Sequence, residues 1–379
     1  ISDIGSPLHF DEPEKLGSDD DIPDVYKILE FLTMAIWGWA TLAVENAAQK
    51  AETEAERKVQ IALSEGAAEA GIANLQKRAI ECGIDHGIPD LLIQISRLNG
   101  SDQERYRGVL DNEEAVKMID YASSGAISTA SIVNELANCL LTSGVTDILL
   151  RLLFSTQVEC RECAGAALVE LVETSEEGAL NVLSKGGVDR MLDVLDPGED
   201  YAALASSHPL MTFAGAALMH MSFFVFSEVP VPRIQQTINA LQSAIDGTKE
   251  ESKVDRVLEK YVGCALWRFC FNQTNCSRIG KCGGIPVITR CAFNLISGLL
   301  RGDQHTSTED SICLLEFLTS ALWLLSYDDH NADLMVLAKG DDDDVDAIIT
   351  LVNVISLPHI PRYDKLHEDG VKALWTLST

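Results

Sequence analysis

Two cysteines three positions apart in one segment have the spacing most suggestive of chemistry. Cys160 and Cys163 form a C-x-x-C pair, which occurs in zinc sites and in thiol–disulfide redox sites. A zinc site needs two further ligands at compatible spacing, and a redox site needs a βαβ context; neither is visible in the sequence. Both cysteines fall where an apolar helical segment begins. Packing inside that helix is therefore the favoured interpretation, with metal or redox work as the alternative.

A run of aspartates is the second candidate. Asp341–Asp344 and Asp346 bring together the carboxylate oxygens that Ca²⁺ prefers. The run lacks the glycine and the regular ligand spacing of a preformed calcium loop. It also occupies a bend at which other parts of the chain carry paired glycines, so a solvated, self-repelling loop is favoured over a cation site.

Signatures of known active sites do not accompany these clusters. The sequence contains no GxGxxG, GxxxxGK[ST], HExxH, GxSxG or EF-hand pattern, and its eight histidines are spread singly. We therefore predict no catalytic residue, no metal site and no cofactor, in a protein that is not an enzyme.

Composition favours a binding protein made of helices. Hydrophobic residues make up 46% of the 379 residues and aromatic residues only 6%, which suits a continuous core of packed helices. The formal net charge of −29 disfavours nucleic acid and anionic lipid heads as partners. A protein partner with a basic surface is the electrostatic complement, although an acidic surface also serves solubility alone.

Two further features bear on the cellular compartment of the protein and on membrane insertion. The ten cysteines lie mostly inside apolar helical stretches, which predicts reduced, buried thiols in a cytoplasmic protein. Residues 209–227 carry no formal charge and reach the minimum length for a membrane span. Because this stretch keeps the register of a repeat, we predict a buried helix there and no membrane insertion.

Self-similarity is the dominant pattern in the sequence. Five segments end in an Ala-Leu step whose leucines recur at intervals of 48 to 56 residues, and a weaker copy at 131–136 precedes them. The leucines are Leu168, Leu218, Leu266, Leu322 and Leu374. The uneven spacing predicts loop insertions at 196–209, 246–253 and 301–310, each rich in turn-forming residues.

Glycine turns separate these segments. Glycines at 87, 144, 186 and 283 each follow one helical pattern and precede another. A glycine in this place supplies the left-handed backbone that ends a helix. Pro89 and Pro286 then fall in the first turn of the next helix, where a missing N–H loses nothing. Each unit therefore reads as a short helix, a tight turn, a second helix, and a third helix with the Ala-Leu step.

Residues 262–288, VGCALWRFCFNQTNCSRIGKCGGIPVI, resemble the armadillo repeat, and parts of the pattern recur at 161–192, 321–331 and 373–378. The resemblance implies an all-α fold, a right-handed superhelical α-solenoid of about six armadillo-like repeats. We expect an extended acidic arm at 1–24, a divergent helical cap at 25–84, and repeats at 85–379 that stop within the last repeat.

The same resemblance implies a binding surface. In armadillo proteins the third helices line a concave groove, and in importin-α and β-catenin an Asn two residues after the leucine clamps an extended partner. The matching positions here are Glu135, Glu170, His220, Arg268, Leu324 and Thr376. None is Asn, and the Trp that accompanies it in importin-α is also replaced. We therefore expect a groove that binds a folded domain or a helix, centred on Glu170, His220 and Arg268, and no regular extended-peptide site.

Three tryptophans follow the Ala-Leu step directly, at 267, 323 and 375. Wedging between stacked repeats is favoured for them, with partner anchors as the alternative. Together these features predict a protein-interaction scaffold or adaptor in the cytoplasm, where the cytoskeleton or cilium are fitting places for it. A transport- or chaperone-type receptor that captures basic protein cargo is the alternative.

Overall fold

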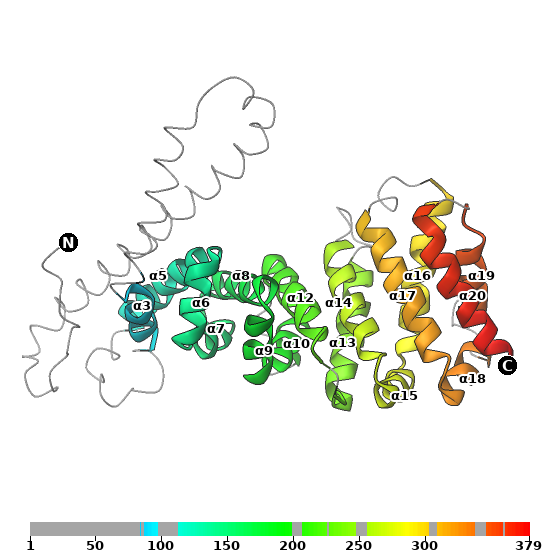
Figure 1. Cartoon of the computed structure of the whole chain (residues 1–379), viewed down its shortest axis with the longest axis horizontal. Coiled ribbons are helices and arrows are strands. Elements are labelled where there is room, and N and C mark those ends of the chain that lie inside the picture. Colours follow the sequence, from blue (N-terminus) through cyan, green and yellow to red (C-terminus); the bar gives the residue numbers. More distant parts are fainter. Residues whose placement is uncertain are drawn as a thin grey trace, which may run out of the picture. The chain divides into compact units, whose positions relative to one another are not determined.

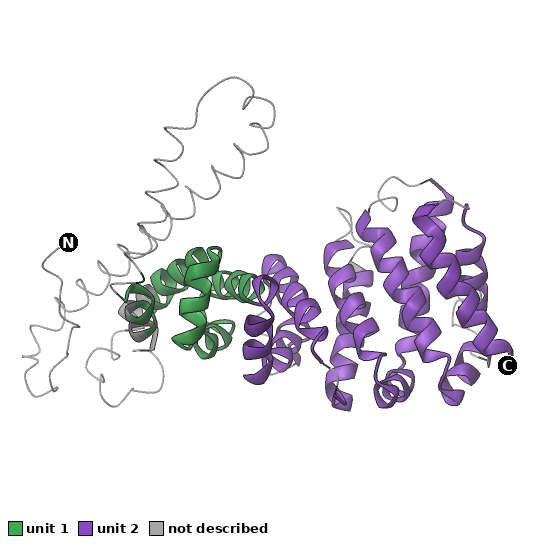
Figure 2. Ribbon diagram, in the orientation of Figure 1, with its two compact units in different colours: residues 1–171 green, residues 172–379 purple. Residues whose placement is uncertain are grey.

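The computed structural model describes residues 84, 87–97, 113–198, 207–225, 227–247, 256–302, 309–337, 346–358 and 361–379. Within these ranges the chain forms helices and turns and no strand, which confirms the all-α prediction. The chain divides into two compact units, residues 1–171 and residues 172–379 (Figure 2). The predicted acidic arm and, except for residue 84, the predicted cap lie outside the described residues.

The first unit contains the helices up to residue 171. They are α3 (Ile88–Arg97), α5 (Glu113–Ser131), α6 (Asn134–Thr142), α7 (Val145–Leu152) and most of α8 (Val158–Thr174). α5 packs against α3 and α6, and buried Leu and Ile side chains of α6 and α7 form the core between them.

The second unit contains the remaining helices. They are α9 (Glu176–Ser184), α10 (Gly187–Leu195), α12 (His208–Ser222), α13 (Val231–Gly247), α14 (Arg256–Phe269), α15 (Gln273–Lys281), α16 (Gly284–Leu300), α17 (Glu309–Leu325), α18 (Asp329–Leu337), α19 (Ala347–Ile355), the 3₁₀ turn η3 (Pro361–Tyr363) and α20 (Asp364–Ser378). Consecutive long helices contact one another in the order α12, α14, α17 and α20, and Figure 1 shows the last three side by side.

A helix triplet recurs along the described chain: a short helix, a middle helix and a third helix, as in α15, α16 and α17. We call the third helix of each repeat its long helix, although the middle helices α13 and α16 also have 17 residues. Six long helices, α5, α8, α12, α14, α17 and α20, confirm the predicted number of repeats. One repeat departs from the pattern, because residues 227–230 run as non-helical chain into α13 where the others have a short helix. The insertion loops predicted near 196–209, 246–253 and 301–310 fall between middle and long helices, and their central residues are not described.

The glycine turns are formed as predicted. Gly144, Gly186 and Gly283 have φ angles of 84°, 81° and 75°, in the left-handed region that side chains with a Cβ rarely adopt. Each directly precedes a middle helix. The backbone therefore bends at the same place in three repeats, by 84° between α15 and α16.

Small residues let the long helices approach closely. A Cβ on Gly263 of α14 would lie 2.6 Å from Leu314 Cδ1 of α17, so a larger residue would force the Leu314 side chain to shift. The Ala-Leu leucines at 168, 218, 266 and 322 are at most 1% exposed. The predicted stacking of repeats through small residues and buried leucines is confirmed.

Two buried asparagines link successive repeats, a role that the sequence pattern did not reveal. Asn275 of α15 accepts a hydrogen bond from the Val229 N–H (2.8 Å) and donates to the Ser227 carbonyl (3.3 Å). Asn331 of α18 donates to the Cys276 carbonyl (2.9 Å). An amide can donate and accept at once, so it satisfies buried backbone groups of the preceding repeat.

Within the described residues, no single helix combines the length and the apolar character needed to cross a membrane. Two helix pairs meet the test only when taken together: α15 with α16, bent by 84°, and α17 with residues 329–336, bent by 117°.

Candidate functional site

Four of the six predicted binding residues lie at equivalent places in the second unit. His220 on α12, Arg268 on α14, Leu324 on α17 and Thr376 on α20 each follow the repeat leucine by two residues, and all four are half-buried. All four thus lie on the third helix of a repeat. Their role in binding a partner stays a prediction.

The other two predicted residues belong to the first unit, and one was assigned to the wrong helix. Glu170 is half-buried on the long helix α8, as expected. Glu135 lies in the first turn of the short helix α6, because α5 already ends at Ser131. Glu170 stands 16 residues before the glycine turn at 186, and the residue 16 before the turn at 144 is Ser128 on α5. Arg268 stands 15 residues before the turn at 283, an offset that gives Thr129, so the counterpart of these residues lies at 128–129 on α5 and is not Glu135.

Arg268 has the most distinctive surroundings of these residues. Its guanidinium carbon lies 4.6 Å from the ring centre of Phe223, 4.8 Å from that of Phe271 and 5.6 Å from that of Trp267. Its Nη2 donates a hydrogen bond to the Phe223 carbonyl (3.2 Å). Among the described residues no carboxylate lies within ion-pair distance of it. Aromatic faces attract cations, so the three rings fix the position of an arginine that has no acidic partner.

Exposed aromatic side chains recur beside this arginine. Phe223, Phe271 and Tyr327 each follow the repeat leucine by five residues, at the ends of α12, α14 and α17, and we call them the aromatic row. Their exposed fractions are 41%, 57% and 60%. Single exposed apolar residues are normal on a protein surface, but here an exposed aromatic ring recurs at one position of three successive repeats.

The three tryptophans that follow the Ala-Leu step differ in their contacts and exposure. Trp267 stacks on Phe317 of α17, with ring centres 5.1 Å apart and planes inclined by 22°, which confirms the wedge interpretation for this residue. Trp323 donates a hydrogen bond to the Tyr327 hydroxyl (3.2 Å) and carries Lys372 of α20 over its ring at 4.5 Å. Trp375 is 72% exposed, so no described repeat covers it.

His220 lies in a partly desolvated position. Burial lowers the pKa of His220 from its ordinary value of 6.5, and the negative charge of Glu173 offsets part of that shift. A lowered pKa favours the neutral ring at physiological pH. His220 therefore adds a neutral hydrogen-bonding group to the surface rather than a charge.

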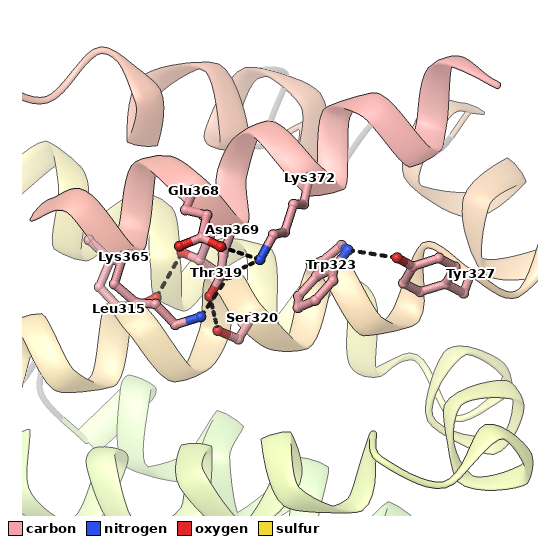
Figure 3. A network of polar contacts seen from close by, with 9 residues as sticks. All are labelled: Leu315, Thr319, Ser320, Trp323, Tyr327, Lys365, Glu368, Asp369 and Lys372. Carbon is pink, nitrogen blue, oxygen red and sulfur yellow. Dashed lines mark hydrogen bonds and ion pairs between the residues drawn. The ribbon is translucent and has the colours of Figure 1, made fainter.

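A buried carboxylate holds the last two long helices together (Figure 3). Asp369 of α20 is 1% exposed and accepts a hydrogen bond from the Ser320 hydroxyl of α17. Lys365 Nζ lies 2.9 Å from its Oδ1 and Lys372 Nζ 3.8 Å from the same atom. Lys372 also pairs with Glu368 at 2.5 Å. Here every charge has a partner inside the protein.

The C-x-x-C pair sits in α8 with unreactive thiols. Burial is the main cause that raises the pKa of Cys160 to about 11, and burial likewise raises the pKa of Cys163. A raised thiol pKa disfavours the thiolate that redox and zinc chemistry need. These values support the packing interpretation.

The remaining described cysteines and Asp346 are not grouped for metal binding. Nine described cysteines are free thiols, of which five are buried and four half-buried. Asp346 caps α19, accepting a hydrogen bond from the Ile348 N–H (2.6 Å), while residues 341–344 lie outside the described part. No group of three or more His, Cys, Asp or Glu side chains in the described ranges is placed to hold a metal ion.

No protein-family model and no curated protein matches this chain. Among solved structures it is similar to the designed armadillo repeat protein YIII(Dq)4CqI, with 14% identity and a TM-score of 0.48 over 76% of this chain and 99% of that one. It is also similar to computationally designed armadillo repeat proteins for modular peptide recognition (14%, 0.49, 76% and 98%). A third likeness is the designed armadillo protein YIII(Dq.V1)4CPAF in complex with peptide (KR)4 (14%, 0.47, 76% and 98%). The six long helices, the left-handed glycine turns and the recurring triplet are what make this fold armadillo-like.

Proposed function

We propose that this chain is a protein-interaction scaffold whose partner binds to the second unit, on the surface formed by the C-terminal ends of α12, α14 and α17. The observation that supports this most directly is the aromatic row, Phe223, Phe271 and Tyr327, of which Phe223 and Phe271 lie against Arg268. Aromatic and arginine side chains are the residue types most enriched at the energetic centres of protein interfaces.

Repetition strengthens the proposal. Solvent exposure of a large ring costs free energy unless something covers it, and the same repeat position carries such a ring in three successive repeats. His220 and Leu324 lie at the binding positions of the neighbouring long helices. The surface thus combines apolar area with a few polar groups, as recognition surfaces do.

The alternative function is a receptor that captures basic cargo. The net charge of −29 supports it, because an acidic surface attracts basic proteins at long range. The cation at the centre of the aromatic row opposes it locally. Capture by charge would weaken steeply with ionic strength, so salt dependence separates the two functions. A cytoplasmic location, the absence of catalysis and the absence of nucleic-acid binding remain predictions.

Affinity capture from the native source tests the proposal. Wild-type chain should retain a partner that Phe271→Ala and Tyr327→Ala each lose, as quantified by mass spectrometry. Leu300→Ala is the matched control, because Leu300 on the middle helix α16 has the same exposed fraction as Phe271, 57%. Equal retention by all three variants would place the binding surface elsewhere on the molecule.

A further inference from the structure

Arg268 is one of four cations of the second unit, with Lys281, Arg290 and Arg301, that have no acid beside them among the described residues. Arg233 pairs with Asp189 at 2.8 Å, Arg278 with Glu228 at 2.7 Å and Lys260 with Asp310 at 2.5 Å. The chain has 58 acidic residues against 29 lysines and arginines, so partners are abundant. Of these four cations, Arg268 is the one that lies against aromatic rings, at the half-buried position of the repeat.

The Arg268 guanidinium also has unused N–H donors and a restricted side-chain position. A guanidinium has five N–H donors, and within the described residues Arg268 uses one, to the Phe223 carbonyl. Its Nε is buried and has no hydrogen-bond acceptor. Stacking between Phe223 and Phe271 restricts the side chain, so little further rotamer freedom is lost when a ligand binds.

On the basis of the proposed function, we infer that the partner presents an aspartate or glutamate side chain next to an apolar one, with the carboxylate on Arg268 and the apolar group on the aromatic row. A carboxylate matches the planar donor fork of arginine. The exposed faces of Phe223 and Phe271 flank that position and supply apolar contact. A lysine or arginine of a partner would instead meet a like charge.

The inferred recognition runs against the overall charge of the protein. Net charge acts over distances that salt screens within about 8 Å, whereas the carboxylate and Arg268 would be in contact and partly desolvated. The groups in direct contact with Arg268, rather than the net charge of the protein, therefore decide which side chain binds at this position. The overall negative charge would slow the approach of an acidic segment without removing its preference for this site.

Peptide arrays test this inference directly. The probes are sets of three synthetic peptides that differ at one position, which holds Glu, Gln or Lys beside a fixed Phe or Leu. Wild-type full-length chain should bind the Glu member of a set at least about thirtyfold more tightly than the Gln member, as expected for a lost partly desolvated charge contact. Arg268→Gln should remove this difference, and Arg268→Glu should shift the preference to the Lys member.

Two controls separate this inference from the proposed function. Arg301→Gln removes an exposed arginine at the end of α16 and should leave the preference intact. Binding that requires Phe271 but is indifferent to Arg268, or a wild-type preference for Lys, would overturn the inference and leave the scaffold function standing. If no peptide binds, the inference is overturned as well, and the capture experiment decides the function independently.

Discussion

The α14–α17 and α17–α20 junctions of the second unit carry chemically different residues at the same repeat position. Six residues before Trp323, α17 carries Phe317, which stacks on Trp267 of α14. Six residues before Trp375, α20 carries Asp369, which is buried against Ser320 of α17. One junction is aromatic, and the other is polar and ionic.

The charged residues near the two junctions also have different neighbours, polar and ionic at one junction and aromatic at the other. At the α17–α20 junction the buried carboxylate has a hydroxyl and two lysines around it (Figure 3). Near the α14–α17 junction the arginine has aromatic rings around it and no acid. The first charge is paired within the fold, whereas we propose that the second binds a partner. Substitutions at the two places should therefore separate stability from binding.

The largest expected effect is on stability at the α17–α20 junction. Asp369→Ala should lower the free energy of unfolding by about 2–3 kcal/mol, because Ser320 and Lys365 lose a buried acceptor. Denaturant unfolding of the full chain measures this. Lys365→Ala should cost less than about 1 kcal/mol, since the Lys365 side chain is 54% exposed. Equal effects of the two substitutions would mean that the carboxylate is not the centre of the network.

A slightly smaller effect is expected at the aromatic junction. Trp267→Ala should cost about 2 kcal/mol, because it removes the stacking on Phe317 and half-buried apolar area. Trp375→Ala is the matched control at the same repeat position, and its exposure of 72% predicts a change within about 0.5 kcal/mol. Similar losses of melting temperature in the two variants would contradict the wedge role of Trp267.

Arg268→Gln should alter stability little. Contacts between an accessible cation and aromatic rings contribute about 0.5–1 kcal/mol, and no ion pair is lost. The same unfolding measurement should therefore show a change below about 1 kcal/mol, in contrast to Asp369→Ala. A loss as large as that of Asp369→Ala would show that Arg268 serves the fold and would weaken the comparison.

The smallest effect concerns pH. The folded pKa of His220 lies below its ordinary value of 6.5, so between these two values the unfolded chain binds more protons than the folded one. The stability contributed by neutral His220 is thus fully present above pH 6.5 and is lost as pH falls toward the folded pKa. His220→Gln should flatten this part of the pH–stability profile, followed by thermal melts in a pH series. An unchanged profile would show that other groups cause the dependence.

Much of the fold could be predicted because its signals are local. A glycine at 144, 186 or 283 ends a helix through its own backbone freedom, and a leucine in an apolar helix is buried wherever a neighbour packs. Counting along the repeat then places His220 and Arg268 on their long helices. The same counting failed at Glu135, because residues 131–136 have the composition of the Ala-Leu step while α5 ends at Ser131.

What the sequence determined by itself is the all-α class, the repeat, its turns and which side chains share a repeat position. Only the tertiary structure decided what those side chains touch. Phe223 precedes Arg268 by 45 residues, and nothing in the local pattern shows that the packing of α12 against α14 brings ring and cation to 4.6 Å. Asp369 likewise reads as one more acid in an acidic chain until α20 packs on α17 and buries it against Ser320. Hydrophobic periodicity records burial along one helix, whereas the partner of a charge depends on side chains that packing brings from other repeats.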